Sequence, residues 1–468
     1  MVVAGIWNAE EQPDDLRANN TQASRLSTVP EDSGQPAAAV TPYPPSRNGQ
    51  VLKPAKDPSP TKHQGQIIGL DIVRCAAAVY VLLYHYGCWI WAGNNFPGTF
   101  GAQDHWMAPF SWPGWVGVEI FFVLSGFVIA YSAQSNTASG FAKSRIIRLY
   151  PTAWICTAIT LVTAGFFEGS KYWWPSLKPL AHTIVIAPWT INWIDASFWT
   201  LAVELSFYSI IFLLLAFRLY ERLGIVMMTL GASTSILAVY RAGIAAGLYG
   251  GGHFGAKIMA VAQNQRYFFL LANHGMFFAL GCLIWLCLLQ RVTPARLTGA
   301  AVCTVGSLAE IYLHCRLFVT DAEQRGLAAI EGDRCHALLP MTIWVLAIVA
   351  IIGSVSFNAR MSALAGSRGA KAIRCLGLMT YPLYLVHQTA GFEIISRLQR
   401  RVGFSTSVFL TSGLMITLSF IIVRFLEKPL QSVFKTALGV ASRQTASHTA
   451  AWSTIGTQVA QCRDMERA

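Results

Sequence analysis

Residues 67–91, IIGLDIVRCAAAVYVLLYHYGCWIW, form an apolar run long enough to cross a bilayer as a helix, and this run indicates the class of fold. It nevertheless carries Asp71, Arg74 and His85, and ionisable groups at membrane depth are costly. A helix turns by about 100° per residue, so the step from Arg74 to His85 closes three turns to within roughly 20°. We therefore expect both side chains on one face, with Asp71 one turn before Arg74, in a polar stripe roughly 20 Å long that faces protein or water.

The composition is that of a multi-pass membrane protein. Of the 468 residues, 54% are hydrophobic and only 12% are charged, and the mean hydropathy is +0.44. The net charge of +12 would suit a nucleic-acid-binding protein, but the basic residues stand singly or in small groups between apolar runs, as topology signals do. The ten cysteines form no CxxC pair, so the sequence predicts neither a metal site nor a disulfide framework.

Ten apolar segments are predicted to cross the membrane, so we expect an all-α, polytopic transmembrane helix bundle. Residues 1–65 and 431–468 are predicted to be polar tails, the first of them disordered, and 66–430 the membrane domain. The segment 181–194 is short and is interrupted by Pro188, which predicts a re-entrant or interfacial position. The ten expected spans are 67–91, 115–133, 149–167, 197–219, 224–240, 267–290, 298–318, 338–357, 375–395 and 404–426.

The distribution of Lys and Arg predicts the orientation of these spans. With both ends of the chain in the cytosol, the inner loops and flanks carry 18 basic residues and the outer loops carry 11. This excess favours an integral protein of the cell membrane, plasma or inner, with both termini cytosolic. On that topology His85 lies in the outer half of the first span, whereas Arg145 and Arg148 face the cytosol.

Four further stretches carry polar side chains at depths where lipid would reject them. The first places Glu119 near the outer end of a span and Ser125 at mid-depth. The second places Arg145 and Arg148 one turn apart, where two guanidiniums could hold a phosphate through forked hydrogen bonds. The stretches are WVGVEIFFVLSGFVIAYS (115–132), KSRIIRLYP (143–151), FWTLAVELSFY (198–208) and YPLYLVH (381–387).

The third and fourth stretches align polar groups along single helix faces. Glu204 and Tyr208 are four residues apart, and Tyr384 and His387 are three apart, so each pair shares a face. All these groups are candidates for substrate binding or for structure, because polar side chains also cross-link helices by hydrogen bonds. Likewise, Arg74 could be an ion-pair partner of Asp71, and Arg145 and Arg148 could be topology anchors. The small residues at 125–126 could form a helix-packing contact.

Together these motifs resemble the acyltransferase 3 family of integral-membrane O-acyltransferases. The resemblance rests on Arg74 and His85, with ten residues between them, and on the four stretches in family order, and it covers about 67–430. It departs from the family pattern at the opening RG-x-D-x-x-R, which here reads IIGLDIVR with Ile68 in the first place.

The resemblance implies transfer of an acyl group, commonly acetyl from acetyl-CoA, to a hydroxyl of a carbohydrate or similar acceptor such as a bacterial surface polysaccharide. It also implies that Arg74 and His85 are essential and that Arg145 and Arg148 are associated with the acyl-CoA donor. Some members carry an extracytoplasmic SGNH-type domain, for which we expect no room here. Either the membrane domain then completes the transfer, or a separate extracytoplasmic partner protein does.

The chemistry can also be argued from the residues. Acyl transfer to an alcohol needs a general base, a site for the oxyanion and a means of holding the polyanionic donor. His85 is the predicted base, because an unperturbed imidazole has a pKa of roughly 6.5. Asp71 or Glu119 would orient it, although three to four turns separate Asp71 from it, and Arg74 suits the pantetheine or phosphates. Direct attack by the acceptor is favoured over transient acylation of His85 or Ser125.

A second function class fits the same polar stripe. A transporter or carrier of a lipid-linked sugar or small polar solute would use the stripe as its pathway. Many such proteins are built from two halves with matching hydropathy, and no such halves are apparent in this sequence.

Overall fold

The computed structural model describes residues 67–89, 106–190, 192–324 and 337–439, all within the unit formed by residues 60–468. The predicted N-terminal tail, and the second tail beyond residue 439, lie outside this part. All regular structure in the described ranges is helical, and no strand occurs there. The predicted all-α fold is therefore confirmed.

Eight helices in the described ranges are long and apolar enough to cross a membrane, and each coincides with one of the ten predicted spans. The predicted span at 267–290 appears as the shorter helix α10 (Gly275–Leu289). The predicted span at 375–395 is wrong as a single helix, because it is divided between α13 (Asn358–Val386) and α14 (Thr389–Val402). The eight helices are Ile68–Cys88, Ala108–Ala133, Ala138–Glu168, Phe198–Ala216, Tyr220–Ala245, Pro294–Val319, Leu338–Ser356 and Phe404–Ala437.

The first span changes its winding at the residue that the sequence singled out. Helix α1 (Ile68–Tyr84) is α-helical, and the chain continues as the π-helix η1 (His85–Trp89). The predicted span at 67–91 is therefore helical from Ile68 to Trp89, with a change of winding at His85, and residues 90 and 91 lie outside the described ranges. Short π-helical segments are rare and often mark functional sites.

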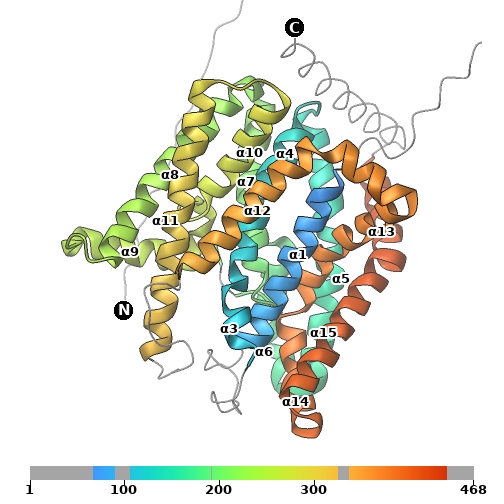
Figure 1. Cartoon of the computed structure of the whole chain (residues 1–468). Coiled ribbons are helices and arrows are strands. Elements are labelled where there is room, and N and C mark those ends of the chain that lie inside the picture. The colour runs from blue at the N-terminus through green and yellow to red at the C-terminus, as the bar shows by residue number, and fades with distance from the viewer. Residues whose placement is uncertain (1–66, 90–105, 191, 325–336, 440–468) are drawn as a thin grey trace, which may run out of the picture. The chain divides into compact units, whose positions relative to one another are not determined.

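Glycines set the central helix crossing. Helix α4 (Val116–Ala133) packs against α10, and α10 also packs against α8 (Leu223–Ala245) and α11 (Pro294–Gln324) (Figure 1). A Cβ atom on Gly126 would lie 2.2 Å from the carbonyl oxygen of Phe278, and one on Gly281 would lie 2.1 Å from that of Val123. Only glycine permits this approach, which is a common way of joining helices in a membrane.

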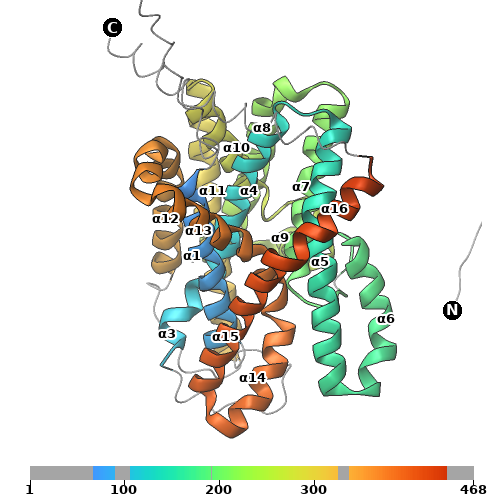
Figure 2. The ribbon, with the colours of Figure 1, turned by 90° about the vertical axis from the view of Figure 1, so that its right-hand side faces the viewer.

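On the other side of α4, α1 packs against α4, α13 and α12 (Leu338–Ser356). Helix α5 (Ala138–Glu168) forms a hairpin with α6 (Ser170–Val185), and α16 (Glu427–Ala437) crosses α5 (Figure 2). Helices α7 (Phe198–Ala216), α14 and α15 (Phe404–Ile421) complete this side.

The expected re-entrant segment 181–194 begins as the last turn of α6. Beyond Val185 it leaves the helix at Ile186, whose φ is 53°, and folds back so that the backbone N–H of Ile194 donates to Thr183 Oγ1 at 2.8 Å. Its predicted place at the membrane interface stays a prediction.

Candidate active site

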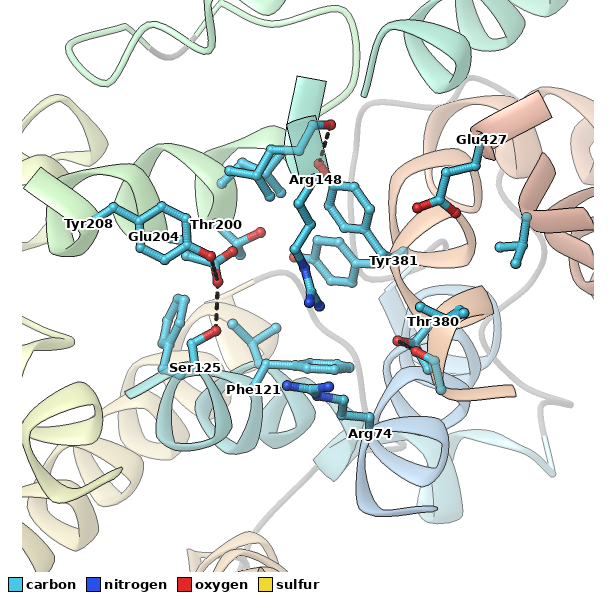
Figure 3. Close-up of a pocket in the computed structure, with 18 of the residues that line it drawn as sticks. Arg74, Phe121, Ser125, Arg148, Thr200, Glu204, Tyr208, Thr380, Tyr381 and Glu427 are labelled. Carbon is cyan, nitrogen blue, oxygen red and sulfur yellow. Dashed lines mark hydrogen bonds between the residues drawn. The ribbon is translucent and has the colours of Figure 1, made fainter. Parts of the chain in front are cut away.

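A cavity of about 290 Å³ lies among α1, α4, α5, α7, α13 and α16 (Figure 3). Charged and hydroxyl-bearing side chains share its wall with aromatic rings. Polar groups at this depth are a mark of function in membrane proteins. The polar lining comprises Arg74, Ser125, Arg148, Thr200, Glu204, Tyr208, Thr380, Tyr381, Tyr384, Glu427, Lys428 and Gln431.

Two arginines give the cavity its positive charge. Arg74 from α1 and Arg148 from α5 lie on opposite walls (Figure 3), and Lys428 lines the same cavity from α16. Arg145, one turn before Arg148, lines a neighbouring pocket instead, with its guanidinium 5.4 Å from the ring of Phe141 and 5.8 Å from that of Tyr208. The structure therefore separates the two arginines that the sequence paired.

Asp71 holds this basic wall in place. Its side chain is 3% exposed, and its Oδ1 lies 3.3 Å from Nη1 of Arg374 and 3.7 Å from Nη1 of Arg74. The predicted register of Asp71 and Arg74 is therefore present, and the carboxylate binds a second arginine from α13. Arg374 was not recognised as a site residue, because its sequence position indicates only an inner-loop cation.

A carboxylate faces the arginines from α7. Ser125 Oγ on α4 and the Tyr208 hydroxyl on α7 both donate to Oε1 of Glu204, each at 2.6 Å. The predicted shared face of Glu204 and Tyr208 is thus present, and Ser125 joins it from another helix (Figure 3). The adjacent Gly126 serves the contact with α10, so the pair at 125–126 has two separate roles.

Two histidines meet beside the cavity. Nε2 of His387 lies 3.0 Å from Nδ1 of His85, and the ring centroids are 4.8 Å apart. Tyr384 connects this pair with the cavity, because it lines the cavity wall and its ring centroid lies 5.6 Å from that of His387. The first and the last motif of the sequence are therefore neighbours in space.

The two carboxylates predicted to orient His85 are engaged with other groups. Asp71 binds the arginines described above, and Oε2 of Glu119 lies 3.7 Å from Nδ1 of His274. The ring of His387 lies within hydrogen-bonding distance of the His85 ring.

Asp195 is a residue that the sequence reasoning missed. It is fully buried, its Oδ1 accepts the backbone N–H of Ser197 at 2.9 Å, and its Oδ2 accepts that of Thr389 at 3.0 Å. It thereby ties the turn before α7 to the first residue of α14, two positions after His387. The sequence did contain a signal for this residue, because Asp195 stands two residues before Ser197 at the start of a helix. In the common turn of this kind, the Asp carboxylate accepts the backbone N–H of the residue two positions later.

The chain is similar in sequence to a known family and to two known proteins. The model of the acyltransferase 3 family, described as an acyltransferase domain, matches residues 67–424. "Nodulation protein 10" of Rhizobium leguminosarum bv. viciae is 29% identical over 196 residues, which cover 37% of this chain and 52% of that protein. The "Putative peptidoglycan O-acetyltransferase YrhL" of Bacillus subtilis (strain 168) is 27% identical over 170 residues, which cover 32% of this chain and 24% of that protein.

These matches thus span about half of one relative and a quarter of the other. No solved structure matches the chain. The family match is much longer and includes the histidine pair and the cavity helices α1, α4, α5, α7 and α13, whereas α16 begins at Glu427, beyond the end of the match. This chain therefore belongs to the acyltransferase 3 family and is an integral membrane protein.

Proposed function

We propose that the protein is an O-acyltransferase that moves an acyl group, acetyl in the first instance, from acyl-CoA to a hydroxyl of a carbohydrate acceptor, with His85 as general base. The observation that carries this proposal is a cavity with two guanidiniums on its walls beside a pair of imidazoles, of which His387 is buried and His85 is half-buried. The cavity offers positive charge for a polyanionic donor, and the pair offers a base for a hydroxyl.

The cavity wall supports acyl-CoA as the donor. Arg74, Arg148 and Lys428 supply cationic donors for phosphate oxygens, whereas the aromatic rings suit the pantetheine and acyl parts. The volume of about 290 Å³ is at the small end of ligand pockets, which run from roughly 300 to 1,000 Å³, so the adenosine would stay outside. In this proposal Arg148 takes the donor role, and Arg145 supports Tyr208 in the wall.

The proposed reaction needs one base and no cofactor. The acceptor oxygen attacks the thioester carbonyl carbon while its proton passes to His85. The tetrahedral intermediate then collapses, the C–S bond breaks, and His85 returns the proton to the leaving thiolate. The products are the ester and the free thiol of CoA.

The name of one relative, a putative peptidoglycan O-acetyltransferase, supports a glycan acceptor. We place the protein in the cell membrane with both termini cytosolic, so that the donor arrives from inside and the acceptor meets it in the outer half. The transfer is completed either by this domain or by a separate extracytoplasmic partner.

The test uses membranes that contain the full chain, radiolabelled acetyl-CoA, and peptidoglycan fragments or chitooligosaccharides as acceptors. Labelled ester should form, and His85→Ala should abolish it while the protein remains folded and present in equal amount. The exposed His253 on α9 (Gly252–Gln263) provides the matched control, His253→Ala. Ester formation by His85→Ala at the original rate would overturn the base assignment, whereas solute movement without any acyl donor would indicate a transporter.

A further inference from the structure

We propose that His387 is a positioning residue that sets the tautomer of His85, so that Nε2 of His85 receives the acceptor's proton. This inference rests on the proposed role of His85 as the base and adds the group that orients it. It is carried by the hydrogen-bond partners of three ring nitrogens, namely both nitrogens of His387 and Nδ1 of His85.

The partners of His387 determine where its proton lies. Its Nδ1 is 2.8 Å from the carbonyl oxygen of Tyr384 and 3.2 Å from that of Leu383. A carbonyl oxygen can only accept a hydrogen bond, so Nδ1 carries the proton and donates it. In a neutral imidazole the other nitrogen, Nε2, then holds a lone pair and is an acceptor.

The same reasoning passes to His85. Its Nδ1 is 3.0 Å from the carbonyl oxygen of Val81 and 3.0 Å from Nε2 of His387. Both neighbours accept, so Nδ1 of His85 must be the protonated nitrogen and Nε2 the basic one. In the opposite tautomer, a lone pair on Nδ1 of His85 would face the lone pairs of the Val81 carbonyl oxygen and of His387 Nε2, each 3.0 Å away.

The surroundings hold the second imidazole in this orientation. His387 is 1% exposed, and its carbonyl oxygen accepts a hydrogen bond of 2.7 Å from the hydroxyl of Tyr86. The two hydrogen bonds of Asp195 fix the start of α14 just beyond it. His387 also lies at the end of α13, where the helix path is interrupted. The ring is therefore built into a packed helix junction and cannot turn without disturbing it.

The arrangement corresponds in role to the third member of a catalytic triad, which holds a histidine in the correct tautomer and stabilises it once protonated. When Nε2 of His85 takes the acceptor's proton, the Nδ1–H of the resulting imidazolium stays hydrogen-bonded to Nε2 of His387. His387 itself gains and loses no proton. The proton leaves from Nε2 of His85 to the thiolate of CoA, so the cycle closes.

Two substitutions separate the two functions of the His387 ring. His387→Asn keeps an N–H near the position of Nδ1, for the carbonyls of α13, but is too short to reach His85. His387→Gln can place a carbonyl oxygen near the position of Nε2 and accept from His85. We expect kcat to fall on the order of 100-fold or more in the Asn variant, with KM for acetyl-CoA within about twofold, and to recover by at least about tenfold in the Gln variant.

A spectroscopic measurement tests the tautomer without relying on activity. In 15N-histidine-labelled protein in lipid, the His85 signals are those lost in His85→Ala, and they should show a protonated Nδ1 and an unprotonated Nε2. In His387→Asn the same signals should shift towards a mixture of tautomers, whereas His253→Asn should leave them unchanged. An unprotonated Nδ1 in the unsubstituted protein would overturn the inference even if no His387 variant folded.

The failures of the two proposals are distinguishable. If His85→Ala retains activity, His85 is not the base and the proposed function fails. If His85→Ala is inactive but folded His387→Asn keeps the original kcat, the base assignment stands and the positioning role fails.

Discussion

Asp71 and Arg374 are 303 residues apart in the chain, and Nη1 of Arg374 lies 3.3 Å from Oδ1 of Asp71. This contact joins α1 to α13 and leaves Asp71 shared with Arg74, whose guanidinium is on the cavity wall. Asp71 therefore affects the cavity through Arg74, whose guanidinium it holds in place.

Replacing this acid should affect stability and donor binding together. In Asp71→Asn the charge that holds two guanidiniums is lost, and we expect a loss of about 2 kcal/mol in the free energy of unfolding. KM for acetyl-CoA should rise because Arg74 is no longer oriented. Thermal unfolding in detergent and steady-state kinetics measure the two effects.

The matched control is Glu168→Gln. Glu168 pairs with Arg397 at 3.5 Å, but the two side chains are 50% and 36% exposed, so the change should cost less than about 1 kcal/mol. Equal destabilisation by the two substitutions would show that burial of Asp71 adds nothing to its ion pairs.

The glycine crossing of α4 and α10 should tolerate no added methyl group. Gly126→Ala or Gly281→Ala would press a Cβ atom against a backbone oxygen at about 2 Å, and we expect each to cost about 1 to 3 kcal/mol. Gly353→Ala and Gly413→Ala are the controls, because a Cβ at either helical position meets nothing within 4 Å. They should be neutral or stabilising by up to about 1 kcal/mol. Thermal unfolding of the four variants decides the point, and a loss of stability in all four would contradict the close-approach argument.

Arg148 and Arg145 should differ in their effect on the donor. Arg148→Ala removes a guanidinium from the cavity, and charge-assisted hydrogen bonds of about 1.5 to 3 kcal/mol predict a KM for acetyl-CoA raised on the order of tenfold or more. Arg145→Ala should raise it less, because that guanidinium lies in the neighbouring pocket beside Tyr208. The comparison requires steady-state kinetics with acetyl-CoA varied at a fixed acceptor concentration. A larger effect from Arg145 would return the donor role to that residue.

Ser125 should be dispensable as a nucleophile. Its hydroxyl donates to Glu204 at 2.6 Å, which holds the carboxylate, and direct attack by the acceptor requires no acyl-serine. We expect Ser125→Ala to lower kcat by no more than about tenfold, the loss of one hydrogen bond to a charged group. Peptide mass spectrometry after incubation with acetyl-CoA alone should find no acetyl group on residue 125. An acetylated Ser125 together with an inactive Ala variant would establish a covalent route.

Local patterns in the sequence determined the class of fold and much of the placement along each helix. The length of the apolar runs predicted eight helices that the structure contains, and the helical repeat correctly put Asp71 beside Arg74 and Glu204 beside Tyr208. These features depend on neighbours within one or two turns, and the helix period alone sets them.

Which helix faces meet became clear from the packing of the helices and not from the sequence. His85 and His387 are 302 residues apart, Asp195 and Thr389 are 194 apart, and no helical repeat relates such positions. The same applies to the separation of Arg145 from Arg148, which face different pockets because α5 is packed on more than one side. Side-chain periodicity within one helix is local, whereas a site among six helices is fixed by how their surfaces fit together, and that fit depends on the whole bundle at once.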